Sequence, residues 1–382
     1  MKLRVLRSLS EIDAESWDRC ANPPGQAFNP FVSFAFLSAL EDSRSAVRET
    51  GWLGHHLVLE DGGVKGIVPC YRKSHSYGEY VFDHGWAEAF ARAGGRYYPK
   101  LQVSVPFTPV TGPRLLANDR ASRAVLAEAL QHLCKEEDAS SVHMTFVPEE
   151  DWTALGGRGW LKRTDIQFHW HNKGYSTFDD FLGDLSSRKR KNIRKEREAV
   201  REAGIECEWI AGTAITEKHW DAFFRFYMDT GSRKWGSPYL TRKFFSLIGE
   251  RLADKIVLIM CRRGGRMIAG ALNLAGSDAL YGRNWGAIEH HPCLHFEACY
   301  YQAIEFAITH KLARVEAGAQ GPHKLARGYL PQMTYSLHHF SHPGLAQAVE
   351  RYLDQERAAI AAEKSELADY SPFRHEAEAD GV

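Results

Sequence analysis

The chain has 382 residues, of which 44% are hydrophobic and 25% charged, so it is long enough to build two cores. Lys+Arg and Asp+Glu each number 48, so the zero net charge gives no global indication of nucleic-acid binding. The seven cysteines form no CxxC pair, and no apolar run has the length of a membrane span. These features argue against a disulfide framework and predict a cytoplasmic protein without a membrane span.

The first 160 residues predict one mixed α/β domain. Strands are expected at 3–6, 56–60, 64–71 and 141–147, and helices at 12–20, 33–40 and 121–134. The sequence Asp61-Gly62-Gly63 predicts a hairpin turn between the second and third of these strands. From residue 75 to 113, proline and glycine interrupt an aromatic and polar stretch. This predicts ordered loops that line a groove, with a packed structural loop as the alternative.

The second half repeats this rhythm over residues 161–343. Strands are expected at 165–171, 256–262, 267–274, 279–286 and 313–317, with a helix at 294–310 before the last strand. Strand, helix and strand make a crossover unit, and ligands of such folds bind at the strand ends. The remaining segment, 344–382, predicts a charged helix over 344–368 and a disordered end.

The helix expected at 294–310 is apolar almost all round, which predicts a position between layers. Glu297, Tyr301 and Glu305 lie at i, i+4 and i+8 on one side of it. Glu297 has two interpretations: a buried carboxylate paired with an arginine such as Arg283, or a general base whose pKa is raised by burial. His295, in the first turn, either shares the catalytic role or caps the helix.

Three histidines, one cysteine and two glutamates crowd into residues 289–297, a composition that also occurs in metal sites. No second ligand pair follows at zinc-like spacing, so we predict no metal. A Cys–His nucleophile built on Cys293 or Cys299 is a further alternative, but nothing in the sequence orders such a pair.

Residues 186–197 carry the strongest local charge of the chain, in a helix that a serine N-cap begins and Gly204 ends. Its N-terminal cations are Arg188, Lys189, Arg190, Lys191 and Arg194. They repel one another and the positive end of the helix dipole, so a bound polyanion would convert this repulsion into attraction. We therefore expect a phosphate-bearing ligand here, with a solvated helix face as the alternative.

Together these residues resemble the FemAB-like branch of the GNAT acyltransferase superfamily, bacterial proteins usually described as predicted N-acyltransferases. The resembling motifs are residues 75–83, 97–100, 106–109, 188–194, 281–286, 295–297 and 316–328. The resemblance implies two tandem GNAT-like domains with a substrate groove between them, and transfer of an acyl group to an amine. In the related Fem peptidyltransferases the donor is an aminoacyl-tRNA and the acceptor a peptidoglycan precursor, whereas ordinary GNAT enzymes use acyl-CoA.

The sequence departs from the GNAT pattern in one place. The glycine-rich pyrophosphate loop before the crossover helix is not recognisable, and residues 290–295 take its place. Pro292 lacks an N–H donor and the neighbouring histidines crowd a backbone cradle. The phosphates of a donor are therefore expected at residues 188–191, or at Lys324 and Arg327.

The predicted function is an N-acyltransferase that uses acyl-CoA or aminoacyl-tRNA to acylate a small-molecule or peptide amine. Glu297, with His295 or Glu316, would deprotonate the amine, and backbone N–H groups or Lys324 would stabilise the oxyanion. Residues expected to bind the substrate are Tyr281, Arg283, Trp285 and Tyr301, with Asp83, Tyr98 and Lys100 from the first domain. The alternative is a non-catalytic protein that keeps the fold and holds a peptide or an anionic metabolite, which the missing glycine-rich loop favours.

Overall fold

In a computed structural model, described for residues 1–235, 238–318 and 321–374, the chain divides into two compact units. Unit 1 comprises Met1–Asp165, Tyr239–Phe244 and Met333–Ala362, and unit 2 comprises Ile166–Pro238, Phe245–Gln332 and Glu363–Val382. The predicted boundaries at 160 and 343 gave each domain one continuous stretch. The observed units differ because two later segments pack with the first unit. One of them is anchored by Thr241, whose hydroxyl donates to the Ser43 carbonyl at 3.0 Å.

Unit 1 contains two sets of strands. One is ordered β1-β3-β4 and the other β2-β5-β6-β7-β14. Their bounds are β1 Lys2–Leu6, β2 Trp52–Gly54, β3 His56–Glu60, β4 Val64–Val68, β5 Cys70–Lys73, β6 Lys100–Val103, β7 Ser141–Val147 and β14 Leu330–Phe340. The predicted hairpin is β3–β4, and the predicted strand over 64–71 is in fact two strands, β4 and β5. Gly62 and Gly63 in its turn have φ of +64° and +147°, which favour glycine.

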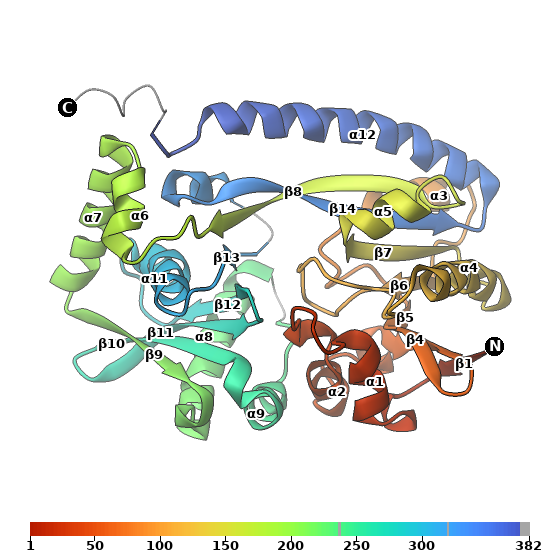
Figure 1. Ribbon diagram of the computed structural model, residues 1–382, viewed down its shortest axis with the longest axis horizontal. Coiled ribbons are helices and arrows are strands. Elements are labelled where there is room, and N and C mark those ends of the chain that lie inside the picture. Colours follow the sequence, from red (N-terminus) through yellow and green to blue (C-terminus); the bar gives the residue numbers. More distant parts are fainter. Residues whose placement is uncertain (236–237, 319–320, 375–382) are drawn as a thin grey trace. The chain divides into compact units, whose positions relative to one another are not determined.

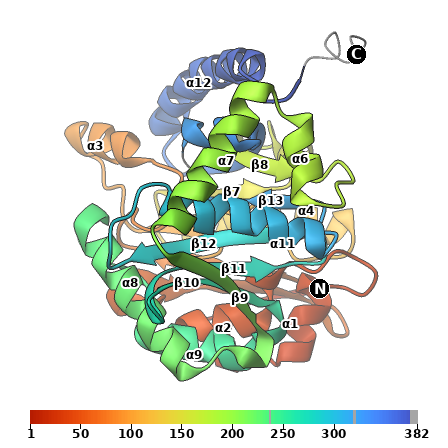
Figure 2. The same ribbon diagram turned by 90° about the vertical axis from the view of Figure 1, so that its left-hand side faces the viewer.

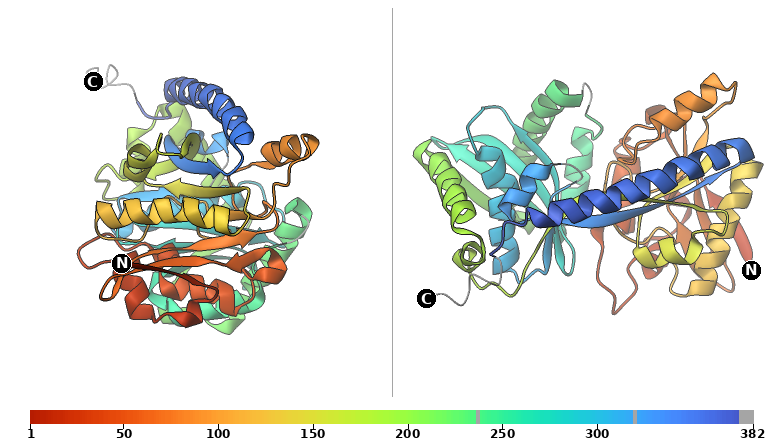
Figure 3. Two further views of the ribbon diagram at one scale, coloured as in Figure 1. Left: turned by 90° about the vertical axis from the view of Figure 1, so that its right-hand side faces the viewer. Right: turned by 90° about the horizontal axis from the view of Figure 1, so that it is seen from above.

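The helices of unit 1 cover these strands (Figures 1 and 3). They are α1 Ala14–Ala21, α2 Phe34–Asp42, α3 His84–Arg92, α4 Arg120–Glu136 and α5 Glu149–Leu155. β6 and β7 pair in parallel, so α4 is a crossover helix, and it buries Leu126, Leu130 and Leu133 in the core. Residues 75–113 hold α3 and β6, where only loops were predicted. β6 is four residues long and buried throughout, so it lacks the alternation that marks a half-buried strand.

Unit 2 is built on strands ordered β8-β13-β12-β11-β10-β9, and the part of β8 up to Asp165 belongs to unit 1. Their bounds are β8 Leu161–His171, β9 Ile205–Ala211, β10 Ile256–Arg263, β11 Arg266–Ala275, β12 Ala279–Ala287 and β13 Arg314–Glu316. The helices are α6 Phe178–Asp184, α7 Ser187–Glu202, α8 Glu217–Trp235 and α9 Arg242–Arg251. The predicted β10–β11 hairpin is confirmed, whereas β9 and β14 were not predicted. At Gly286 a Cβ atom would lie 2.2 Å from the Phe226 backbone of α8, so only glycine permits this contact.

The predicted crossover unit is confirmed, because β12 and β13 pair in parallel. The connecting helix was expected to be continuous over 294–310. It consists instead of α10 Leu294–Phe296, a π-helical segment Glu297–Tyr301 and α11 Gln302–Thr309. Such π-helical turns are rare and are frequently found at functional sites.

The last helix, α12, spans Pro343–Asp369 and corresponds to the charged helix predicted over 344–368. Of the end expected to be disordered, residues 375–382 lie outside the described part of the chain. Within that part, Leu185 and Phe373 form a β-bridge, and the Arg374 N–H donates to the Asp184 carbonyl at 3.1 Å. No helix of the described residues has both the length and the apolar character that a membrane crossing requires. The groove expected between two domains stays a prediction.

Candidate functional site

The candidate site of unit 2 lies where the parallel strands β12 and β13 end their pairing. The pairing joins Ala279–Tyr281 to Arg314–Glu316, and β12 then continues to Ala287. Glu316 is the last residue of β13, so its side chain is placed at the carboxyl end of the strand. This edge is where ligands of open α/β sheets bind.

Glu316 is a buried carboxyl group with one engaged and one free oxygen. It is 4% exposed, and its Oε1 accepts a 2.9 Å hydrogen bond from Arg314 Nε. Its Oε2 has no hydrogen-bond partner in the described part of the chain, and His169 Nε2 lies 3.8 Å away. Burial raises the pKa of Glu316, and this effect outweighs the opposing effect of the Arg314 charge. The buried side chain is therefore a stronger base than an exposed glutamate.

Lys324 brings a buried cation to the same region. The side chain is 2% exposed, and Nζ donates a 2.9 Å hydrogen bond to the Gly318 carbonyl, two residues beyond Glu316. Burial lowers the pKa of Lys324 to about 8. Burial, and then the charges of Arg314, His171 and Lys324, lower the pKa of His169 to about 3.

Glu297, the predicted base, is engaged by Arg197 of α7. Arg197 Nε lies 3.2 Å from both carboxylate oxygens, and Nη2 lies 3.0 Å from Oε1. Gln302 Nε2 donates to the same Oε1 at 2.7 Å, and Arg197 Nη2 also donates to Glu305 Oε2 at 2.8 Å. These contacts favour the structural alternative for Glu297, with Arg197 rather than Arg283 as the partner.

The middle residue of the predicted stripe, Tyr301, also contacts α7. Its hydroxyl donates to Glu196 Oε2, and Arg327 Nη2 donates to Glu196 Oε1 at 2.7 Å. The Arg327 guanidinium lies 3.5 Å from the Phe296 ring centroid and is 8% exposed. Arg327 thus binds side chains of the site itself. Figure 2 shows α7 lying across the β12–α11 region, as these contacts require.

Glu196 and Arg197 were not predicted as site residues, because the cations before them dominate the charge pattern of the helix. A usable signal was present: Ile193 and Val200 are buried, and at helical spacing Glu196 and Arg197 share their stripe. Polar residues on a buried stripe require partners. The missed pair therefore marks the inward face of α7.

The cations at the start of α7 differ in exposure: Arg188, Lys191 and Arg194 are exposed, whereas Lys189 and Arg190 are half-buried. The helix begins after Ser186, as predicted, although the Ser186 side chain makes no capping hydrogen bond. Arg194 pairs with Asp179 at 3.1 Å. The side chains of the four preceding cations make no hydrogen bond or ion pair with any other described residue: Arg188, Lys189, Arg190 and Lys191. Their mutual repulsion is therefore not compensated within the described part of the protein.

The remaining predicted residues of unit 2 fall into two groups. Tyr281 accepts a 3.3 Å hydrogen bond from Arg314 Nη2, so it belongs with Glu316, and the Arg283 charge also acts on Glu316. His295 packs instead in an aromatic cluster, with ring centroids 5.4 Å from Trp285 and 5.3 Å from Tyr300. The β11–β12 register shifts at this point and leaves Arg283 without a register partner on β11, so the simple alternation of β12 is interrupted between Arg283 and Trp285.

The predicted residues of unit 1 form a buried ionic cluster. Lys100 is fully buried, and Nζ donates to Glu79 Oε2 at 2.6 Å, to Ser76 Oγ at 2.8 Å and to Asp83. Tyr98 is hydrogen-bonded to Ser76 at 2.8 Å. Burial would raise the pKa of Asp83, but the Lys100 ammonium outweighs it and holds that pKa well below its usual range. The cluster anchors the polypeptide between Ser76 and Asp83.

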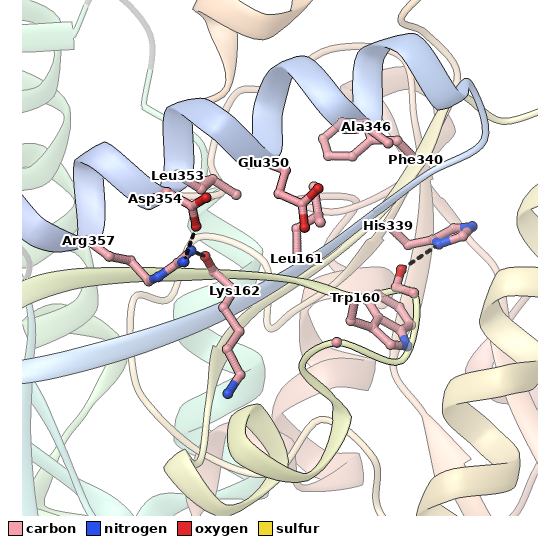
Figure 4. Close-up of a pocket in the computed structure, with 12 residues that line it drawn as sticks. Trp160, Leu161, Lys162, His339, Phe340, Ala346, Glu350, Leu353, Asp354 and Arg357 are labelled. Atoms are coloured by element: carbon pink, nitrogen blue, oxygen red, sulfur yellow. Dashed lines mark hydrogen bonds and ion pairs between the residues drawn. The ribbon is translucent and has the colours of Figure 1, made fainter.

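A cavity of about 500 Å³ lies in unit 1 between α12 and the strands β8 and β14 (Figure 4). Its apolar lining includes Trp160, Leu161 and Phe340. At its edge Arg357 donates to the Lys162 carbonyl at 2.5 Å. None of the residues predicted for the site lines this cavity. In the ranges described, no group of three or more His, Cys, Asp or Glu side chains is arranged to hold a metal ion.

Comparison with known proteins gives a family and a fold. The model of the FemAB-like family, described as peptidoglycan biosynthesis/recognition, matches residues 8–375. The crystal structure of FemX is similar at a TM-score of 0.57 and 11% identity, over 92% of this chain and 100% of that one. The structure of L-PGS from Bacillus licheniformis is similar at a TM-score of 0.52 and 9% identity, over 86% and 98%. No curated protein matches. The predicted α/β fold class with mixed sheets is confirmed.

Proposed function

This chain belongs to the FemAB-like family and is a transferase, and we propose that it moves an acyl or aminoacyl group from an activated donor to an amine. The observation that carries the proposal is the free, buried Oε2 of Glu316 at the end of β13, with the Lys324 ammonium in the same region. Acyl transfer to an amine needs a proton acceptor and a positive group for the oxyanion. Glu316 and Lys324 supply these two functions.

In the proposed reaction, Glu316 Oε2 takes a proton from the acceptor ammonium, and the freed amine attacks the donor carbonyl. The carbonyl oxygen becomes an oxyanion in the tetrahedral intermediate. Lys324 uses one N–H on the Gly318 carbonyl, and an ammonium has three, so two remain for this oxygen. Collapse of the intermediate expels the carrier as a thiolate or alkoxide, which takes the second proton of the attacking nitrogen, and leaves the amide; Glu316 then releases its proton to solvent. Burial strengthens the attraction between Lys324 and the oxyanion.

Glu297 has a positioning role in this proposal. With Arg197 it holds α7 against the π-helical segment, and Arg327 does the same through Glu196 and Tyr301. His295 and Trp285 contribute an aromatic wall, and Tyr281 and Arg283 lie beside Glu316. Catalysis by Glu297 or His295 stays a prediction, and their substitution tests it.

The donor is proposed to be acyl-CoA or aminoacyl-tRNA, because both carry phosphates that suit the four uncompensated cations of α7. Arg327 is already engaged by Glu196, so we assign it no phosphate. The family description supports a peptidoglycan-related peptide amine as the acceptor. A role of Asp83, Tyr98 and Lys100 in binding substrate stays a prediction; within unit 1, Lys100 and Tyr98 both contact Ser76.

The first experiment is a thermal-shift titration with CoA, acetyl-CoA, longer acyl-CoAs and aminoacyl-tRNA. A ligand at a hundred times its Kd stabilises the native state by about 2.7 kcal/mol, which is easily measured as a raised Tm. The ligand that binds is then offered with amine acceptors to the wild type and to Glu316→Gln.

The matched control is Glu198→Gln, which changes an exposed carboxylate of α7. Turnover by the wild type and Glu198→Gln but not by Glu316→Gln supports the proposal. Donor binding without turnover over a broad panel of amines would favour the non-catalytic alternative. Full turnover by Glu316→Gln would overturn the assignment of the base.

A further inference from the structure

Two cysteines of unit 2 face each other across neighbouring strands. Cys207 of β9 and Cys261 of β10 are direct partners in the antiparallel register, and their sulfur atoms lie 3.1 Å apart. Residues directly opposite in such a pair have Cα atoms about 4.5 or 5.5 Å apart. Disulfides accept Cα separations of about 4.4–6.8 Å. The two thiols can therefore be joined without a rearrangement of the sheet.

The two thiols differ in access. Cys207 is partly exposed, whereas Cys261 is fully buried. Its hydrogen bond with Cys207, and then burial, raise the pKa of Cys261 far above the ordinary value. A reagent from solution therefore reacts with Cys207 first, and Cys261 is reached only through Cys207. This is the arrangement of an attacking thiol with a resolving thiol.

The pair lies on the sheet face that packs against the π-helical segment and α11. Cys207 and Trp209 are two residues apart on β9, so their side chains share a face. Trp209 Nε1 donates to Gln302 Oε1 at 2.8 Å, and Gln302 Nε2 donates to Glu297 Oε1 at 2.7 Å. Two hydrogen bonds thus connect the strand of Cys207 to the Glu297–Arg197 pair.

We propose that Cys207 and Cys261 form a dithiol modification site, which a low-molecular-weight disulfide oxidises to an intramolecular disulfide. The Cys207 thiolate attacks one sulfur of the small disulfide, forms a mixed disulfide and expels one thiolate. Cys261 loses its proton and attacks Cys207 Sγ, and the second thiolate leaves. Two electrons pass from the protein to the reagent, and the two protons released end on the two small thiols. The site stands independently of the proposed transferase reaction.

The test uses the full chain and oxidised glutathione, with peptide mapping by mass spectrometry. In the wild type we expect one Cys207–Cys261 link and a mass lower by about 2 Da, reversed by dithiothreitol. Because the bridge closes a loop between residues 54 apart, oxidation should also raise the Tm. Absence of this link, or a link between Cys261 and Cys299, would overturn the proposal.

Three variants separate the roles of the thiols. Cys261→Ser should accumulate glutathione on Cys207, because no resolving thiol follows. The Cys207→Ser variant should form no disulfide with Cys261, and oxidised glutathione should not raise its Tm. The matched control, Cys299→Ser, keeps both partners and should form the bridge as the wild type does. A Cys261→Ser protein that carries no glutathione on Cys207 would contradict the assigned order of attack. The wild-type mapping decides the proposal even where a serine variant fails to fold.

Discussion

Arg197 and Glu297 lie 100 residues apart in the chain and form a hydrogen-bonded ion pair, in which the guanidinium reaches both carboxylate oxygens at 3.0–3.2 Å. The pair joins α7 to the π-helical segment. The side chain of Glu297 is 6% exposed and that of Arg197 is 19% exposed, so little water is available to replace a lost partner. The contact therefore contributes to the position of every group on that segment.

Replacing Arg197 by methionine should destabilise the protein by about 3 kcal/mol, because the Glu297 carboxylate loses its cation while it stays buried. Urea unfolding measures this free energy. The control is Arg201→Met, one turn further along α7, where the exposed pair with Glu198 should be worth no more than about 0.5 kcal/mol. The double variant Arg197→Met with Glu297→Met should recover much of the loss. Equal stability of Arg197→Met and the wild type would contradict a structural role for the pair.

Glu316→Gln and Glu297→Gln should affect activity in different ways. The first removes the proton acceptor, so we expect kcat to fall by about 10²–10⁴-fold with little change in donor affinity. Glu297→Gln keeps a hydrogen-bond acceptor for Arg197 but removes the negative charge of the carboxylate. Its main effect should therefore be a lower Tm. Steady-state kinetics and thermal unfolding of both variants measure the difference. A larger loss of kcat in Glu297→Gln than in Glu316→Gln would indicate that Glu297 is the general base.

The pH dependence should report Lys324, whose pKa burial lowers to about 8. The charged form is needed at the oxyanion, so kcat should fall as pH rises through about 8. In Lys324→Arg the fall should move to higher pH, because arginine keeps its charge. Stability should change in the opposite sense. The folded pKa lies below the ordinary 10.5, so the unfolded chain binds more protons between these values and stability rises with pH.

The basic start of α7 should bind the donor. Replacing Arg188, Lys189, Arg190 and Lys191 together by glutamine should raise the donor Kd at least about tenfold. It should also raise the Tm of the free protein slightly, because four repelling cations are removed. With a tRNA donor, each lost phosphate contact should lower the slope of log K against log salt by about 0.7–0.9. As a control, Arg92 and Arg96, two exposed cations of unit 1, are replaced by glutamine. This control should leave the donor Kd and its salt dependence unchanged.

Lys100→Met should strongly destabilise unit 1. Lys100 Nζ lies 2.6 Å from a carboxylate oxygen of Glu79 and also pairs with Asp83. Without Lys100, these two buried carboxylates lose the positive charge of its ammonium group. We expect a cost of about 3–5 kcal/mol in urea unfolding. Lys65→Met, an exposed lysine of the same unit, is the control and should change stability by no more than about 0.5 kcal/mol. A small effect at Lys100 would show that the cluster contributes little to the fold.

Local sequence patterns predicted the elements that local physics controls. The β3–β4 and β10–β11 hairpins follow from Gly62-Gly63 and Gly264-Gly265, and α4 follows from its 3.6-residue apolar repeat. The crossover from β12 to β13 followed from an apolar helix between two strand patterns. The break of that helix at Glu297 was not predictable, because a π-helical turn needs one extra residue per turn and carries no strong local signal.

The sequence by itself determined the mixed α/β class, the crossover unit and the crowded cations of α7, because periodicity, turn residues and charge order act over a few neighbouring residues. Only the tertiary structure decided that Glu297 pairs with Arg197 rather than Arg283, that Arg327 is held by Glu196, and that one Glu316 oxygen has no partner among the described residues. It also assigned Met333–Ala362 to the first unit. These outcomes depend on which elements pack together, and a buried charge takes its partner from whichever element is packed against it.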